Sequence, residues 1–230
     1  MVAMDNSPQQ LTQLYLYTFN QSRFWAFKQM GIGPVKLKGT QGLLFYKFLG
    51  TGGGNGFSLR PDFSTYALLL VWESEAAAMS FVNTSLYKAY LKKAEHIRCL
   101  SLRSFQSHGQ WSGQNPFRQT KGKAKSDEKI AIITRATLRW RRLFSFWRYV
   151  PQAARAIEMA KGVLYFKGIG EWPFIQQATI SIWNTLDDLL LFAYRDTSHA
   201  SIVKKTRQKK WYAEDLFARF TIQNDVVIKS

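Results

Sequence analysis

His199 is the side chain of this sequence whose setting most favours metal binding. It follows Asp196, Thr197 and Ser198, residue types that end one helix and cap the next, so we expect it in the first turn of a new helix. The partial positive charge at a helix amino terminus disfavours imidazolium, and a neutral ring can donate a lone pair to a metal. The alternative is an exposed histidine in a basic helix, because the segment 204–210 that follows is rich in lysine and arginine.

The other residues with reactive side chains form no recognisable catalytic set. His96 and His108 carry no local signature that would join them to a serine or cysteine nucleophile, and no motif marks a pair of carboxylates. Cys99 is the only cysteine, which excludes a disulfide and a thiolate cluster for zinc or iron–sulfur. The glycine-rich segment 51–56 lacks the lysine and hydroxyl residue of a phosphate-binding loop, so it predicts a connection between two strands.

The elements that must position His199 occur in an order that repeats once along the chain. Hydrophobic periodicity predicts strands at 11–19, 42–50, 66–72 and 97–105, with a helix at 23–30 that ends at Gly31 and Gly33 and a helix capped by Ser74 that runs to about Lys93. The second half has predicted strands at 130–139, 162–170, 178–183 and 212–222, and helical segments at 143–160, broken near Pro151, and at 186–210. Each half is a βαββαβ unit, the ferredoxin-like arrangement.

The two halves also match residue by residue, which indicates an internal duplication. Segment 42–50 matches 162–170 with Lys47 and Lys167 and both terminal glycines in register. The other matching pairs are Phe24-Trp25 with Phe146-Trp147, and Trp72 and Phe81 with Trp183 and Phe192.

The predicted strands are apolar on both faces, so each sheet needs a partner on the face that its helices leave open. We therefore predict an α+β fold in which two tandem ferredoxin-like repeats pack sheet to sheet, as a dimeric α/β barrel within one chain. The first repeat is predicted at 1–117 and the second, which would hold a cofactor, at 130–230. The basic segment 118–129 has no apolar periodicity and is predicted to be a mobile linker.

Composition and charge limit the partners. The 32 Lys and Arg against 15 Asp and Glu give a formal net charge of +17, which attracts nucleic acid or acidic lipid headgroups. Nucleic acid is not expected, because the aromatic residues do not follow the pattern of an RNA-binding sheet. The chain begins without a basic and apolar leader and has no run of eighteen apolar residues. These features predict a cytoplasmic protein that can contact the inner face of an anionic membrane peripherally.

Several uncommon peptide words give the chain a family resemblance over nearly its whole length. The words are FWAFKQMG at 24–31, the glycine-rich 50–57, QWSGQNPF at 110–117, TRAT at 134–137, GIGE at 168–171, QQ at 176–177, SIW at 181–183 and 211–220. In these words and their order the chain resembles spheroidene monooxygenase and its homologues, a family of carotenoid-oxidising proteins of bacterial pigment pathways. It departs from that family in the linker, in the basic segment 204–210 and at Gln114-Asn115.

The resemblance implies a haem-dependent monooxygenase that hydroxylates or ketolates an acyclic carotenoid, with haem b iron, dioxygen as co-substrate and an unidentified electron donor. It also implies that a histidine on a helix of the carboxy-terminal half ligates the iron, and His199 matches that position. Arg135 and Lys167 are then candidates to pair with haem propionates, although a packing or sheet-surface role is an equal alternative for each. The same alternative holds for the candidate pocket residues Trp111, Trp172 and Gln177.

Two other functions stay open on this scaffold. One is a different haem reaction, such as dehydration of an aldoxime, and the other is a non-enzymatic carrier of haem or of a lipophile. The sequence assigns no catalytic residue to any of the three.

Overall fold

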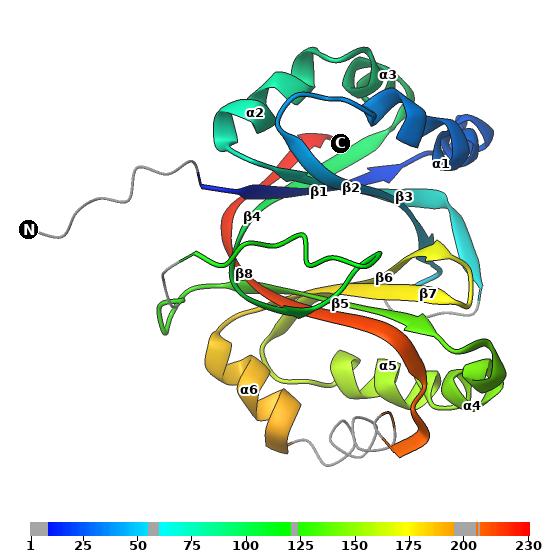
Figure 1. Ribbon diagram of the computed structural model, residues 1–230, viewed down its shortest axis with the longest axis vertical. Coiled ribbons are helices and arrows are strands. Elements are labelled where there is room, and N and C mark those ends of the chain that lie inside the picture. The colour runs from blue at the N-terminus through cyan, green and yellow to red at the C-terminus, as the bar shows by residue number, and fades with distance from the viewer. Residues whose placement is uncertain (1–8, 55–59, 121–123, 196–205, 207) are drawn as a thin grey trace, which may run out of the picture.

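Eight antiparallel strands form one closed barrel, in the order β1-β3-β2-β6-β7-β5-β8-β4. The computed structural model describes residues 9–54, 60–120, 124–195, 206 and 208–230 (Figure 1). The elements of the first half are β1 (Leu11–Thr18), α1 (Arg23–Leu37), β2 (Leu43–Gly52), β3 (Pro61–Trp72), α2 (Glu75–Ser80), the 3-10 helix η1 (Phe81–Asn83), α3 (Ser85–Lys93) and β4 (His96–Gly109). Those of the second are β5 (Ile130–Leu138), the 3-10 helix η2 (Trp140–Arg142), α4 (Leu143–Trp147), α5 (Val150–Glu158), β6 (Val163–Trp172), β7 (Gln176–Trp183), α6 (Leu186–Arg195) and β8 (Tyr212–Lys229).

The predicted fold is confirmed: each half is a βαββαβ unit, and the two sheets join into an α+β barrel of the dimeric α/β type. The sheets meet along two seams, where β2 pairs with β6 and β4 pairs with β8, both antiparallel. Figure 1 shows the helices of the first half above its sheet and those of the second half below its sheet. The chain therefore encloses its core in three layers, one inside the barrel and one under each set of helices.

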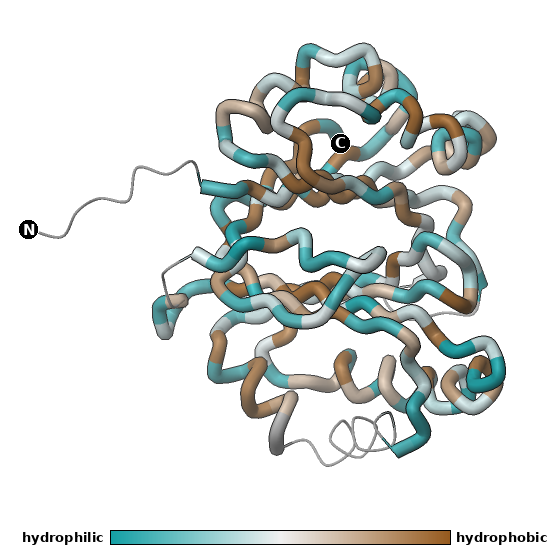
Figure 2. The backbone as a smooth tube through the Cα atoms, in the orientation of Figure 1, coloured by the Kyte–Doolittle hydropathy of each residue, from teal (hydrophilic) through white to brown (hydrophobic). Residues whose placement is uncertain are grey.

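The barrel interior is a packed apolar core. Alternate residues of the strands point inward, among them Leu14, Leu69, Ile133 and Ile180, all completely buried. A second core lies between the first sheet and its helices, and a third lies between the second sheet and α5 and α6. Figure 2 shows hydrophobic residues concentrated along the strands of the first half.

The internal duplication is visible in equivalent contacts. The rings of Trp72 and Phe81 lie 5.8 Å apart, and those of Trp183 and Phe192 lie 5.0 Å apart. Gly50 and Gly170, the glycines that the sequence aligns with each other, pair directly across the β2–β6 seam. The seam therefore joins the same position of the two repeats, as the interface of a symmetric dimer would.

The helix in the first half that was predicted to end at Gly31 or Gly33 instead continues to Leu37. A Cβ atom on Gly33 would lie 2.4 Å from the ring of Phe48, so the glycine here permits close packing of the helix on β2. The carbonyl oxygen of Pro34 accepts a hydrogen bond of 2.9 Å from the hydroxyl group of Tyr46. These tertiary contacts stabilise helical geometry that local propensity disfavours.

The predicted helix from Ser74 to Lys93 is divided into α2, η1 and α3. Thr84 has an extended backbone and accepts a hydrogen bond of 3.2 Å from the amide of Tyr87, so it caps α3 as a separate helix. In the second half the break predicted near Pro151 falls just before it, between α4 and α5.

The segment between the repeats lies beside β4 at its start. The amide of Thr120 donates to the carbonyl oxygen of Ser104 at 2.8 Å, and Nε2 of Gln119 donates to that of Ser107 at 2.8 Å. The boundaries at 117/118 and 129/130 stay predictions. Within the described part of the chain, no helix combines the length and hydropathy that crossing a membrane requires.

Candidate functional site

A charged network closes the interior of the barrel beside the β2–β6 seam. The guanidinium group of Arg135, on β5, contacts the carboxylates of Glu214 and Glu171, the latter at 3.6 Å. Glu171 also accepts hydrogen bonds from Nζ of Lys47 at 2.5 Å and from Nε1 of Trp111 at 2.6 Å. The two cations and two carboxylates balance each other, so the network is neutral although it is largely buried.

A tight loop delivers two further donors to this network. Ser112 and Gly113 have φ angles of 57° and 80°, in the left-handed region, and their amides donate to Glu214 at 3.1 and 2.7 Å. Burial alone would raise the pKa of Glu214, but the amides of Gly113 and Ser112 together with Arg135 hold it below its usual value. The loop that follows β4 is therefore fixed to the barrel through a carboxylate that stays ionised.

The second site is the face of the second sheet that lies under its helices. In the first half one row across the strands consists of Phe48, Leu68, Tyr15 and Cys99, all buried. The equivalent row of the second half consists of Gly168, Thr179, Thr134 and Phe217. Three large side chains are thus replaced by a glycine and two threonines.

The neighbouring row repeats this loss of volume. Tyr66 and Tyr17 of the first half, both buried, correspond to Gln177 and Ala136 in the second. We call the positions of these two rows on β5, β6 and β7 the small-residue layer: Thr134, Ala136, Gly168, Gly170, Gln177 and Thr179. Truncation of a packed aromatic or leucine side chain costs about 2–5 kcal/mol when the space is left empty. Such a layer therefore suits a face that receives a ligand.

A hydroxyl pair is the polar feature of the small-residue layer. Oγ1 of Thr134 and Oγ1 of Thr179 lie 2.5 Å apart, and either can donate to the other. When one hydroxyl donates within the pair, the hydrogen of the other is free to donate to a group bound on the layer. Thr134 is only half-buried, whereas Tyr15 at the equivalent position is 2% exposed.

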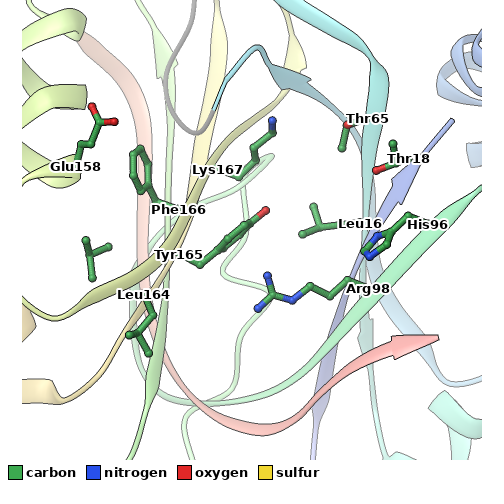
Figure 3. A pocket seen from close by; sticks show the side chains of 11 residues that line it. Leu16, Thr18, Thr65, His96, Arg98, Glu158, Leu164, Tyr165, Phe166 and Lys167 are labelled. Carbon is green, nitrogen blue, oxygen red and sulfur yellow. The ribbon is translucent and has the colours of Figure 1, made fainter. Parts of the chain in front are cut away.

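One pocket opens at the mouth of the barrel, with a volume of about 480 Å³. Figure 3 shows the side chains of Tyr165 and Arg98 extending toward each other across it, and the guanidinium group lies 4.6 Å from the ring centroid. Arg98 also forms two hydrogen bonds with Asp225, at 2.8 and 2.7 Å, which raise the pKa of the arginine further. Lys167, on the same wall, donates to the carbonyl oxygen of Gly54 at 2.8 Å.

A second pocket of about 680 Å³ lies where β5 ends and β8 begins. Its charged lining residues, Arg139, Arg141, Arg142 and Lys210, are all cationic, and Leu138, Trp140 and Ala213 supply its apolar surface. We call it the basic pocket. The chemistry of this lining suits an anionic group beside an apolar one.

The predicted site residues do not gather at one place. Arg135 and Trp111 lie in the barrel interior, where Arg135 is met by two glutamates and Trp111 is completely buried. Lys167 lines the pocket at the barrel mouth and lies 3.8 Å from a carboxylate oxygen of Asp62. Gln177 belongs to the small-residue layer, and its Nε2 donates to the carbonyl oxygen of Trp172, whose side chain is exposed.

The ligand roles assigned to these five residues stay predictions. His199 lies outside the described residues. Among the residues that the structure describes, no group of three or more His, Cys, Asp and Glu side chains is placed to hold a metal ion.

Sequence reasoning missed Lys47, Glu171 and Glu214 as members of one network. A signal was present, because Trp111, Arg135, Glu171 and Glu214 belong to four of the peptide words that carry the family resemblance. These words lie far apart in the chain, and folding brings one charged or hydrogen-bonding residue from each into contact.

The fold places this protein in the dimeric α/β barrel class, with both halves of the barrel formed by one chain. Two solved structures of aldoxime dehydratase share the architecture. One covers 97% of this chain and 85% of its own with a TM-score of 0.59 and 13% identity. The other, in complex with butyraldoxime, covers 95% of this chain and 81% of its own with a TM-score of 0.58 and 13% identity.

No protein-family model matches the sequence. The sequence is, however, similar to curated proteins. The spheroidene monooxygenase of Cereibacter sphaeroides is 31% identical over 217 residues, which are 93% of this chain and 67% of that protein. The spheroidene monooxygenase of Rubrivivax gelatinosus is 31% identical over 86% of this chain and 76% of that protein. That of Rhodobacter capsulatus is 29% identical over 91% of this chain and 88% of that protein. The chain belongs to the spheroidene monooxygenase family.

Proposed function

We propose that this protein is a haem-dependent monooxygenase that introduces oxygen into an acyclic carotenoid, with the haem held between the second sheet and its helices. The activity is supported by membership of a family whose relatives are named for the oxygenation of spheroidene. The observation that carries the location is the small-residue layer, because the first-half equivalents of all its residues except Gly170 are larger side chains that are buried.

The residues of the layer fit a flat macrocycle. Gly168, Ala136 and the two threonines leave the centre of the sheet low, while Phe166, Phe217 and Trp183 contribute apolar surface beside it. Leu189 and Phe192 of α6 pack over the same core, and His199 follows α6 in the chain. On this ground and on the family resemblance, His199 would be the residue that holds the haem iron.

Bound haem would supply the activation of dioxygen. The chain's own residues would orient the polyene and exclude water from it. The free hydroxyl hydrogen of the Thr134 and Thr179 pair would donate one hydrogen bond to an oxygen atom held over the layer. The basic pocket, at the end of β5, would admit the carotenoid beside Trp140.

The ligand assignment is tested with purified protein loaded with haem. We expect His199→Ala to lose the Soret absorption band and most of its haem content, with an unchanged far-UV circular dichroism spectrum. A variant that keeps both at the level of the unaltered protein would refute His199 as the ligand.

The location is tested by restoring the first half's residue. Thr134→Tyr places the side chain found at Tyr15 into the layer, so haem binding should fall. Gln223→Tyr, at an exposed position of β8, is the matched control and should bind haem normally. Equal haem affinity for both variants would place the haem elsewhere.

The activity is tested with the same holoprotein. Supplied with a reductant, dioxygen and an acyclic carotenoid, it should form an oxygenated product that incorporates ¹⁸O from labelled dioxygen. Conversion of an aldoxime to a nitrile without oxygen, or carotenoid binding without product, would instead support the dehydratase or carrier alternative.

A further inference from the structure

The exposed phenylalanine and tryptophan side chains of the described residues lie on one side of the molecule. Among the described residues, every exposed phenylalanine or tryptophan lies on α1, the start of β3, η2, α4 or the β6–β7 hairpin. These elements lie on the right in Figure 1, around the β2–β6 seam. The residues are Phe24, Phe27 and Phe63 in the first half, and Trp140, Phe144, Trp172 and Phe174 in the second.

We call this set the aromatic face. Its members stand out from the surface: Trp140 is 73% exposed and Phe144 85%, and Phe24 is 70% exposed in the other half. Ring contacts hold the face together in each half. Phe27 lies 6.4 Å from Phe63, and Trp147 of α4 lies 5.8 Å from Phe174 of the β6–β7 hairpin. Exposed apolar patches of this kind mark interaction sites.

Cations accompany these rings in both halves. Nζ of Lys28 lies 4.6 Å from the ring centroid of Phe24, and the guanidinium carbon of Arg141 lies 5.1 Å from that of Trp140. Segments 21–38 and 130–157 contain no aspartate or glutamate, so the basic charge of α1 and η2 has no acidic neighbour in its own segment. The carboxylates of Asp62 and Glu171, from the two hairpins, are each paired with a lysine.

We propose that the aromatic face docks the protein on an anionic phospholipid membrane. Aromatic side chains seat at the boundary between acyl chains and headgroups, and lysine and arginine beside them contact the lipid phosphates. The separated, protruding rings interleaved with cations fit this boundary. A second copy would require a flat complementary surface, and nucleic acid offers no apolar phase for Phe144.

The purpose of the docking rests on the proposed function. A carotenoid is stored in the membrane, and the basic pocket opens between Leu138 and Arg142, immediately before α4. Docking by this face would therefore bring the pocket to the lipid surface. The docking itself depends only on surface residues and requires no haem.

The test is co-sedimentation of the full chain with vesicles of phosphatidylcholine alone or with one third phosphatidylglycerol. We expect binding to the anionic vesicles that weakens with salt, and equal binding by His199→Ala, which separates this proposal from the haem proposal. Trp140→Ser with Phe144→Ser should lower the partition coefficient at least about tenfold. Met79→Ser with Leu191→Ser removes similarly apolar exposed residues from α2 and α6, on the opposite side, and should leave it unchanged.

Charge is tested with a matched pair. Arg141→Gln with Arg142→Gln should weaken binding to anionic vesicles about 25-fold, from roughly fivefold for each charge at the surface. Lys92→Gln with Lys93→Gln on α3 removes the same charge elsewhere and should have little effect.

Equal losses for the two charge pairs, or for the aromatic and control pairs, would overturn the proposal, because they would indicate attraction by net charge alone. It would also be overturned if the unaltered protein bound no vesicles. Loss of a dimer, or of binding to an RNA oligonucleotide, in Trp140→Ser with Phe144→Ser would overturn it as well, because the face would then serve a protein or nucleic-acid partner.

Discussion

Replacement of Arg135 by methionine should destabilise the barrel strongly. The arginine side chain is 2% exposed and contacts the carboxylates of Glu214 and Glu171 together. Without it, the network of two partly buried acids would keep one cation, Lys47, which is paired with Glu171. Removal of one partner from a buried ion pair costs about 3–5 kcal/mol, because the remaining charge is left uncompensated. We expect the free energy of unfolding to fall by that amount, although the long methionine side chain keeps most of the apolar packing.

Substitution of either glutamate should lower the free energy of unfolding by less. Glu214 is 22% exposed, and in Glu214→Gln the amide oxygen still accepts from the Ser112 or Gly113 amide while Arg135 keeps Glu171. A hydrogen bond to a charged group contributes about 1.5–3 kcal/mol, so the loss should lie at or below the lower end of that range. In the double variant the two effects should not add, with a coupling energy of about 1–3 kcal/mol.

Urea unfolding at pH 7, followed by tryptophan fluorescence and circular dichroism, measures these differences. The matched control is Arg103→Met, which removes an exposed pair with Glu75 at 3.0 Å and should cost no more than about 1 kcal/mol. A loss below about 1 kcal/mol for Arg135→Met, or strictly additive effects with Glu214→Gln, would refute the account of the network as a buried and coupled unit.

Two further predictions follow from pKa values. The pKa of Glu214 is lower in the folded than in the unfolded state, so its ionised form contributes stability above about pH 4.3, the usual glutamate value, and loses it as the pH falls through the folded value. The stability difference between the unaltered protein and Glu214→Gln should therefore shrink between pH 5 and pH 3 in urea titrations, and a constant difference would contradict the assignment. Burial raises the pKa of the Cys99 thiol to about 12, so a thiol reagent at pH 8 should label it only as fast as the protein unfolds. Labelling that proceeds at the rate of a free thiol would show that Cys99 is accessible.

Much of the fold could be predicted from the sequence because duplication supplies independent checks. Matching glycines, lysines and tryptophans align the sequence of the first half with that of the second, and hydrophobic periodicity predicts the strands. The extension of α1 through Gly31 and Gly33 could not be predicted, because it depends on the contact of Gly33 with Phe48, from another element. Local propensity describes a residue in isolation, whereas this helix is stabilised by the strand beneath it.

The charged network was beyond local sequence reasoning for a similar reason. Lys47 and Glu171 are 124 residues apart and Arg135 and Glu214 are 79 apart, so no window of sequence contains both partners. The small-residue layer was within reach. The repeat that matches β2 with β6 also matches β1 with β5, and it aligns Tyr15 with Thr134 and Tyr17 with Ala136. The two halves of the chain have therefore diverged on this face of the sheet. The first half fills it with large side chains, and the second half has smaller ones there.

Replacement by alanine should affect the free energy of unfolding differently at the two seam glycines, Gly50 and Gly170. A Cβ atom on Gly50 would have the carbonyl oxygen of Gly170 as its nearest neighbour, at 3.9 Å, which is ordinary contact. A Cβ atom on Gly170 would lie 2.6 Å from the carbonyl oxygen of Gln176, a backbone atom that can move only with the β6–β7 hairpin. Gly50→Ala should therefore change the free energy of unfolding by no more than about 0.5 kcal/mol.

Gly170→Ala, in contrast, should cost about 1–3 kcal/mol, as overpacking does. Urea unfolding of the two variants side by side measures the contrast, and each serves as the control for the other. Because the glycines occupy the same position of the repeat and pair with each other, any general effect of alanine in a strand cancels. Equal stabilities would mean that the hairpin yields freely, and the β2–β6 seam would then not be the rigid junction on which the position of Glu171 depends.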